Sequence, residues 1–343
     1  MAYRATLKDV AAAAGVSVTT VSLVLNNRPA RVSEEKRKAI ADAAKKLNYV
    51  PNQSARSLVT KQSQLVALIV PDIENLFFAA LAKCVEDECA AQGYSLIVAN
   101  SDDSRVTEHE LLQRLPARGV DGVMLIPARE SCAGDAAERL REDVALVSCP
   151  VVLIDRLTQC GWCDAVGFDN YLGGRLAARY LLEGGHTRIG IVTGDTAESS
   201  AAERRRGFVD AVEQAGECFD SSLCVYRAAN QIIDGGATAV FCCNDVMALG
   251  FRQRMAERGL HVTEDMQVIG YDNILKRFGL GWRMTTVEQS VADLAAACWG
   301  MLRERIDVAV RAKSGTESGD ARPWLSNPQV EVLTPKLVQA ACA

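Results

Sequence analysis

The chain of 343 residues lacks a long apolar run. No stretch approaches the roughly 18 consecutive apolar residues that a membrane-spanning helix needs. The first four residues lead directly into a helical pattern, without the apolar segment of a secretory signal. The sequence therefore predicts a protein of the cytoplasm that has no membrane as a partner.

Histidine is scarce, with three residues in the whole chain. Cys160 and Cys163 have the spacing of metal ligands or of a redox pair, but a zinc site needs two further ligands. We therefore expect no metal, and a metal or redox role for this pair is the alternative. Several of the other cysteines lie in apolar stretches, where small core residues are expected.

Motifs of common enzymes are missing as well. The chain has no Gly-rich phosphate loop, no nucleophile elbow and no His-bearing metal motif. These absences predict a protein that is not an enzyme and carries no cofactor. Glycoside hydrolysis by paired carboxylates is the alternative, which a turnover assay with aryl glycosides would test.

Charge is distributed unevenly along the chain. Residues 1–62 carry 11 Lys and Arg against 4 Asp and Glu, whereas the remainder carries 27 against 39. A basic head on an acidic body is typical of a DNA-binding module joined to a partner-binding domain. The length also exceeds that of a single core and predicts a division into domains.

The basic head has the pattern of two short helices joined by a tight turn. Thr6 and Asp9 are spaced like a capping box, and Gly15 falls where the first helix must stop. Ser17 can cap the second helix, whose buried side is formed by Val21, Val24 and Leu25. Such a helix-turn-helix can place its second helix in a DNA major groove. A third helix is predicted over residues 33–48.

A short hinge follows the head. Pro51 is placed at the start of a helix of about two turns, which is too short to be stable alone in water. A plain linker is the alternative interpretation of this segment.

From about residue 63, short apolar runs alternate with helical patterns, which predicts an α/β fold with parallel sheets. The predicted strands are residues 65–70, 95–99, 122–126, 151–154, 165–168, 188–192, 239–242 and 267–270.

Polar side chains follow these strands, where ligands of parallel sheets bind. Carboxylates and amides can accept several hydroxyl hydrogens, and an aromatic ring offers a flat apolar face, so the set suits a polyol. The predicted effector-binding residues at these strand ends are Asp72, Phe77, Phe78, Asp155, Asn244 and Asp272. Capping of the following helices is the alternative role for Asp169, Asp245 and Asn273.

The head resembles that of the LacI/GalR family, which includes the lactose, galactose and purine repressors. The residues that carry the resemblance are Asp9-Val10-Ala11, Ala14-Gly15-Val16-Ser17 and Thr20-Val21-Ser22. The resemblance covers nearly the whole chain and implies DNA contacts by Thr6, Ser17, Val18, Thr19, Thr20, Ser22, Leu23, Asn26, Ala55 and Leu58.

Three of these positions have a specific implication. Leu23 stands where the family often has Arg or His, and it cannot form the bidentate contact that Arg makes with guanine. The resemblance also makes Leu58 a wedge that bends the operator from the minor groove, with Ala55 allowing two hinge helices to approach closely.

For the body, the resemblance implies a core like periplasmic sugar-binding proteins, with two doubly wound parallel-sheet subdomains around a cleft. The domains are then a head at 1–50, a hinge at 51–62 and a core at 63–343. The N-subdomain takes about 63–158 and 289–315, and the C-subdomain about 163–286 and 325–343. Crossings between them are expected near 156–164, 285–290 and 315–328.

Two further features come from the same comparison. Arg204, three residues before Gly207-Phe208, matches the family's effector-binding arginine. After Val225-Tyr226 the chain has roughly ten residues fewer than is usual, and the aromatic loop residue that stacks on the effector is missing.

The predicted function is a sequence-specific transcriptional repressor. It would bind a pseudo-palindromic operator in double-stranded DNA as a homodimer and would be switched by a small sugar-like effector. The alternative is a sugar- or nucleobase-binding protein whose DNA switch depends on a co-repressor or is lost. A solute-binding module of a transporter is disfavoured by the basic head.

Overall fold

A computed structural model describes residues 5–25, 29–50, 62–157, 161–194, 200–225, 228–280, 284–313 and 322–340. The chain divides into two compact units, Met1–Ser63 and Gln64–Ala343, and each is considered by itself. Six residues singled out in the sequence lie outside the described residues: Asn26, Pro51, Ala55, Leu58, Cys160 and Tyr226.

The first unit contains the predicted helix-turn-helix, formed by α1 (Leu7–Ala14) and α2 (Val18–Leu25). Asp9 Oδ2 accepts hydrogen bonds at 2.7 Å from both the backbone N–H and the hydroxyl of Thr6. Gly15 ends α1 with a φ of 62°, in the left-handed region that favours glycine. Ser17 Oγ then accepts the N–H of Thr20 at 3.1 Å and so caps α2.

The third helix, α3 (Glu34–Lys46), closes a small apolar core. Val10, Val21 and Ile40 are fully buried in it, one from each helix. A core of this size holds the outer surface of α2 in place, which leaves Val18 and Thr19 exposed at its first turn.

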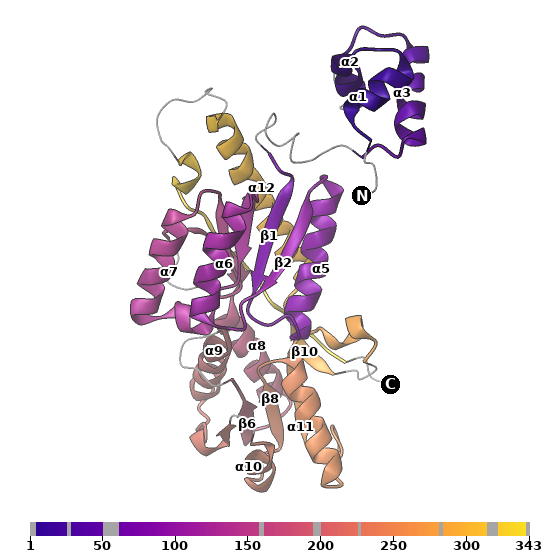
Figure 1. The fold of residues 1–343 in the computed structure, drawn as a ribbon. Coiled ribbons are helices and arrows are strands. Elements are labelled where there is room, and N and C mark those ends of the chain that lie inside the picture. Colours follow the sequence, from indigo (N-terminus) through magenta and orange to yellow (C-terminus); the bar gives the residue numbers. More distant parts are fainter. Residues whose placement is uncertain are drawn as a thin grey trace. The chain divides into compact units, whose positions relative to one another are not determined.

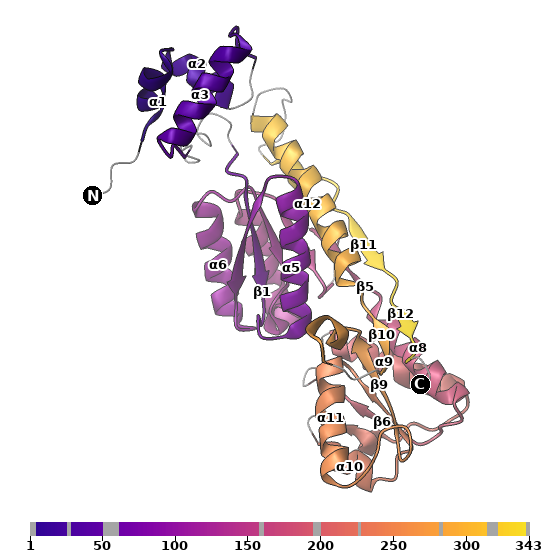
Figure 2. The same ribbon diagram turned by 90° about the vertical axis from the view of Figure 1, so that its right-hand side faces the viewer.

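The second unit contains two six-stranded sheets (Figures 1 and 2). The first sheet has the order β11-β5-β4-β3-β1-β2, and all its strands are parallel. In chain order its strands are β1 (Leu65–Val70), β2 (Ser95–Asn100), β3 (Gly122–Leu125), β4 (Val151–Ile154), β5 (Asp164–Phe168) and β11 (Val330–Leu333).

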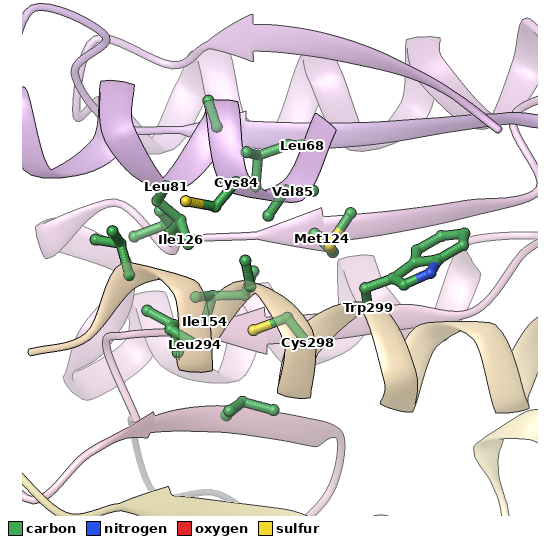
Figure 3. Close-up of a cluster of buried hydrophobic side chains, with 14 of the residues drawn as sticks. Leu68, Leu81, Cys84, Val85, Met124, Ile126, Ile154, Leu294, Cys298 and Trp299 are labelled. Carbon is green, nitrogen blue, oxygen red and sulfur yellow. The ribbon is translucent and has the colours of Figure 1, made fainter. Parts of the chain in front are cut away.

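The helices of this half cover both faces of the first sheet. One face packs on α5 and α12, in an apolar cluster that includes Leu68, Leu81, Met124 and Trp299 (Figure 3). The opposite face packs on α6 and α7. The helices are α5 (Leu76–Ala91), α6 (Arg105–Ala117), α7 (Gly134–Leu146) and α12 (Val291–Lys313), with the 3₁₀ turn η1 (Arg129–Cys132) before α7.

The second sheet has the order β12-β10-β9-β8-β6-β7. Its strands are β6 (Ile189–Val192), β7 (Cys224–Val225), β8 (Ala239–Cys242), β9 (Gln267–Asp272), β10 (Thr285–Glu288) and β12 (Lys336–Val338). β12 is antiparallel to β10, whereas the other pairs are parallel.

Helices cover both faces of this sheet as well. Apolar side chains of α8 and α9 pack on one face, and those of α10 and α11 pack on the other. The doubly wound α/β architecture predicted from the sequence is confirmed. The elements are α8 (Asn170–Glu183), α9 (Ser200–Gln214), α10 (Ala229–Asp234) and α11 (Asp245–Glu257), with the 3₁₀ turns η2 (Ser221–Leu223) and η3 (Leu275–Phe278).

One of the three expected crossings between the sheets agrees with the structure, and two differ. The chain crosses after β10, which ends at Glu288, as expected near 285–290. β5 pairs with β4 in the first sheet, although the expected C-subdomain begins at residue 163. β11 also joins the first sheet, so the other crossings follow β5 and β11. The connection from β4 to β5 is short for parallel neighbours, which usually need a crossover of a dozen or more residues, so the bounds implied by the family resemblance placed β5 in the wrong half.

No single helix among the described residues has the length and apolarity to cross a membrane. α1 and α2 meet that test of length and composition only when taken together, across a bend of 103°.

An ion pair stabilises β5 and the segment before β11, which the expected bounds assign to the other half. Arg305 on α12 donates from Nε and Nη2 to the two carboxylate oxygens of Asp164, at 2.6 and 2.8 Å. The same guanidinium donates to the carbonyls of Ser326 and Asn327, and Asp164 Oδ1 accepts the N–H of Gln329 at 2.8 Å. Because Asp164 is 4% exposed, this pair holds the segment before β11 against β5 in a nearly dry environment.

We expect Arg305→Met to lower the free energy of unfolding by about 3–5 kcal/mol, because it leaves the Asp164 carboxylate buried without its partner. Urea denaturation followed by circular dichroism measures the change. Arg303→Met is the matched control on the same helix, because the side chains of the Arg303–Asp307 pair are 30% and 42% exposed and the pair should contribute about 1 kcal/mol or less. Equal losses of stability for both variants would contradict the role assigned to the Arg305–Asp164 pair.

Candidate functional site

Polar side chains from both sheets form one buried group beyond the carboxyl ends of the strands. We call it the buried polar cluster, and each member is at most 7% exposed. β4 and β5 of the first sheet end next to its first two members, and the others come from the second half or from the crossing after β10. The members are Asp155, Asn170, Arg204, Asp272 and Gln289.

Arg204 is the centre of this cluster. Its Nε donates to Asn170 Oδ1 at 2.7 Å, and its Nη1 donates to the carbonyl of Cys243 at 2.6 Å. The carboxylate of Asp272 lies 3.6 Å from Nη1. The guanidinium carbon lies 3.8 Å from the centre of the Tyr271 ring, which is a cation–π contact.

Glycines leave the space that Arg204 needs in order to occupy this position. A Cβ atom at Gly174 of α8 would overlap the carbonyl oxygen of Arg204, and one at Gly207 of α9 would overlap that of Tyr171. The two helices therefore approach backbone to backbone. A Cβ at Gly173 would likewise overlap the Tyr271 hydroxyl, so the sequence Gly173-Gly174 shapes the floor under the guanidinium.

Asp272 ends β9 in a strained conformation. Its φ is 104° and that of Asn273 is 55°, values that non-glycine residues rarely adopt. Its Oδ1 accepts a hydrogen bond from Gln289 Nε2 at 2.9 Å. Burial raises the pKa of Asp272 to about 7, an effect that the positive charge of Arg204 opposes.

A second buried carboxylate, Asp245, has a structural role. It accepts the N–H of Ile274 and the hydroxyl of Thr286, each at 2.8 Å, and thereby ties α11 to the segments on either side of η3. Burial raises its pKa to about 6. Capping of α11, the alternative considered for this residue, is performed instead by Asn244, whose Oδ1 accepts the N–H of Met247 at 2.7 Å.

Two buried acceptors of the cluster have no hydrogen-bond partner among the described residues. They are Asp155 Oδ1 and Gln289 Oε1. The charge of Asp155 acts on both Arg204 and Asp272, so its carboxylate lies near both groups. A buried acceptor without a partner costs roughly 1–3 kcal/mol. These atoms can therefore receive hydrogen bonds from a ligand that carries hydroxyl or N–H groups.

The remaining predicted effector residues are not members of this cluster. Asp72 is exposed, and its carboxylate accepts the N–H of Glu74 at 2.9 Å. Phe77 and Phe78 are both buried in the apolar cluster beside α5, with their rings edge to face at 5.7 Å. Effector contact by these three residues stays a prediction, as does contact by Asn244.

Sequence reasoning left two cluster members, Asn170 and Gln289, and the neighbouring Tyr271 out of the predicted site. Asn170 follows a strand like the chosen residues, so its position was a usable signal. Tyr271 lies inside a strand and Gln289 lies in a crossing segment, and no local pattern distinguishes either from a structural residue. Only the packing of α8 against β9 brings them to Arg204.

In the head, the predicted DNA contacts lie along α2. Val18 is 39% exposed and Thr19 is exposed, while Ser22 and Leu23 are half-buried. Ser17 and Thr20 hydrogen-bond each other through their hydroxyls at 2.8 Å, so they fix the first turn of the helix. Thr6 is engaged with Asp9, as described above.

Within the described part of the chain, no group of three or more His, Cys, Asp or Glu side chains has a geometry for a metal ion. Cys163 is buried in the first half, and its Sγ lies 3.4 Å from the carbonyl of Val151.

The buried carboxyl of Asp272 makes stability depend on pH. Its pKa is about 7 in the folded protein and about 3.9 when unfolded, so the folded state binds more protons between these values. We therefore expect this group to lower the free energy of unfolding as pH rises from about 4 to 7, by up to a few kcal/mol. Asp272→Asn should flatten this dependence, measured by urea denaturation across that range. An unchanged slope of the free energy of unfolding against pH in the variant would contradict this role of Asp272.

Comparison with known proteins agrees with both parts of this structure. Residues 6–52 match the family described as "Bacterial regulatory proteins, lacI family", and residues 66–295 match a "Periplasmic binding protein domain". The HTH-type transcriptional repressor PurR of Pasteurella multocida (strain Pm70) is 37% identical, over 88% of this chain and 92% of that protein.

Solved structures show the same arrangement. The complex of the transcriptional regulator CelR with cellobiose has a TM-score of 0.67 at 28% identity, and covers 99% of this chain and 100% of that one. The lac repressor dimer bound to its operator, at 23% identity, shares the fold with a TM-score of 0.78 and covers 99% and 100% of the two chains. The chain belongs to the LacI family of bacterial regulatory proteins.

Proposed function

We propose that this protein is a transcriptional repressor that binds a pseudo-palindromic operator as a homodimer and is switched by a small, hydroxyl- or N–H-rich effector bound in the buried polar cluster. The observation that carries the proposal is the presence of both parts in one chain. A basic helix-turn-helix precedes a core in which two buried acceptors, Asp155 Oδ1 and Gln289 Oε1, belong to the same buried cluster as the guanidinium of Arg204. Such a repressor would work in the cytoplasm, where bacterial DNA lies.

The chemistry of the cluster favours a polyol as the effector. Asp155 and Gln289 would accept two hydroxyl hydrogens, and Arg204 would donate to a ring or hydroxyl oxygen. The cellobiose named for the CelR complex fits this chemistry. A nucleobase is the second candidate, because its N–H groups and ring acceptors meet the same requirement and the name PurR belongs to a relative that is 37% identical.

The effector would act through the orientation of the two sheet-bearing halves. It contacts residues of both, so it binds best to the arrangement that brings them together around it. An effector can shift an equilibrium only by its difference in affinity between the two states. The same difference in affinity would set how strongly it alters the binding of the operator.

Selection of random duplex DNA by the purified ligand-free protein, read by sequencing, tests the DNA-binding half of the proposal. We expect an enriched palindrome, and we expect Thr19→Ala to weaken binding to it by roughly 1–3 kcal/mol while binding to unrelated duplexes is kept. The reason is that Thr19 is exposed at the first turn of α2. Equal losses of affinity for the palindrome and for unrelated duplexes would show that Thr19 does not read the base sequence directly.

The absence of any enriched sequence for the free protein would favour the alternative, in which the switch needs a co-repressor or is lost. Repeating the selection with each candidate effector separates these cases. Enrichment that appears only with an effector shows a co-repressor, and none in any condition shows a lost switch.

For the effector half, Arg204→Ala should abolish the response to effector and leave operator affinity unchanged. Arg204 is buried in the core unit, and its hydrogen bonds and ion pair go to residues of that unit. Calorimetry with the effector and fluorescence anisotropy with the operator measure the two properties. Retained effector binding in the variant would count against Arg204 as a ligand.

A further inference from the structure

Arg204 and Asp272 are opposite charges that do not pair closely. Both side chains are only 8% exposed, and their nearest atoms are 3.6 Å apart. Buried guanidinium and carboxylate groups usually form bonds of about 2.7–2.9 Å, often two at once. Here the two shortest bonds of Arg204 instead go to neutral oxygens, those of Asn170 and Cys243.

The neighbours of Arg204 explain this arrangement. Asn170 is itself fixed, because its Nδ2 donates to the carbonyl of Phe168 at 3.3 Å and its Oδ1 also accepts the Tyr271 hydroxyl at 3.4 Å. The Tyr271 ring lies under the guanidinium, and the hydroxyl fits only because Gly173 has no side chain. The guanidinium is therefore held at Nε, at Nη1 and on one face.

We propose that Asn170 is a positioning residue that holds Arg204 back from direct pairing with Asp272, so that both charged groups are kept available to the effector. In this arrangement Nη2 of Arg204 forms no hydrogen bond with a described residue. Asp272 keeps a single hydrogen bond from an uncharged partner, Gln289. This inference rests on the proposed function for its purpose, but not for its geometry.

We call the hold of Asn170 on Arg204 the clamp. Its effect can be observed without any ligand. The charged groups that act on Asp272 are Arg204, Asp245 and Asp155, and its uncharged neighbours are Gln289 and Tyr271. If Asn170 no longer holds Nε, the guanidinium can turn to pair directly with Asp272. The pKa of Asp272 would then fall toward its ordinary value, and the stability loss between pH 4 and 7 would shrink.

The experiment compares the unfolding equilibrium constants of the full chain at pH 5 and pH 7 for the wild type and Asn170→Ala. We expect the constant at pH 7 divided by the constant at pH 5 to fall by about fivefold in the variant, which corresponds to a downward shift of one unit in the pKa of Asp272 over this pH range. Asn75→Ala is the matched control, because it removes an asparagine that caps α5 and does not touch Arg204. The stability of Asn75→Ala should fall, but its ratio of the unfolding constants at the two pH values should equal that of the wild type.

Other results would overturn the proposal. A uniform loss of stability with the wild-type ratio would make Asn170 merely structural, and a larger ratio would mean that Asn170 holds Arg204 toward Asp272. If Asn170→Ala does not fold, Tyr271→Phe serves in its place. That variant removes only the hydroxyl that donates to Asn170, and it should lower the ratio by a smaller factor.

A ligand measurement separates this inference from the proposed function. Cellobiose, D-ribose and adenine are titrated by calorimetry into the wild type and Asn170→Ala. We expect at least about tenfold weaker binding in the variant for each probe that the wild type binds. Equal affinity would overturn the clamp, whereas failure of all three probes to bind the wild type would count against the proposed effector class and leave the pH result to decide the clamp.

Discussion

The parallel direction of the strands is the constraint on which the polar interior of this protein depends. It places the carboxyl ends of neighbouring strands along one edge of each sheet, and Asp155, Asn170 and Asp272 follow such ends. Burying charges at this edge is costly unless each has a partner. Arg204 and its two oxygen partners provide that compensation, which leaves a few acceptors for a ligand.

A close approach of two helices makes this compensation geometrically feasible. α8 and α9 carry glycines where their backbones meet, so the chain can bring Arg204 beneath α8 and onto the Tyr271 ring. A side chain at Gly174 would push α9 outward and withdraw the guanidinium from the cluster. The site therefore depends as much on residues without side chains as on the charged ones.

The regular part of the fold could be predicted from the sequence. Apolar runs gave eight of the strands to within a residue or two, but not β7, β10, β11 or β12, and the caps at Thr6 and Ser17 gave the helix-turn-helix. The sheet membership of β5 was not predicted, because the connection from β4 is shorter than parallel neighbours usually have. Gln289 was missed because its role arises from a contact with a distant strand end, whereas the position of Asn170 after β5 was a usable signal.

The strained end of β9 connects the cluster to the first half of the core. Asp272 and Asn273 have positive φ values, and the next two residues, Ile274 and Leu275, are buried in the apolar cluster beneath α5. Asp245 holds the N–H of Ile274 and so keeps this segment attached to the second half. A change in the charge or bonding of Asp272 is therefore applied to a rigid segment whose apolar end is packed against the other half. Under the proposed function, this packing would couple the bonding of Asp272 to the relative orientation of the two sheets.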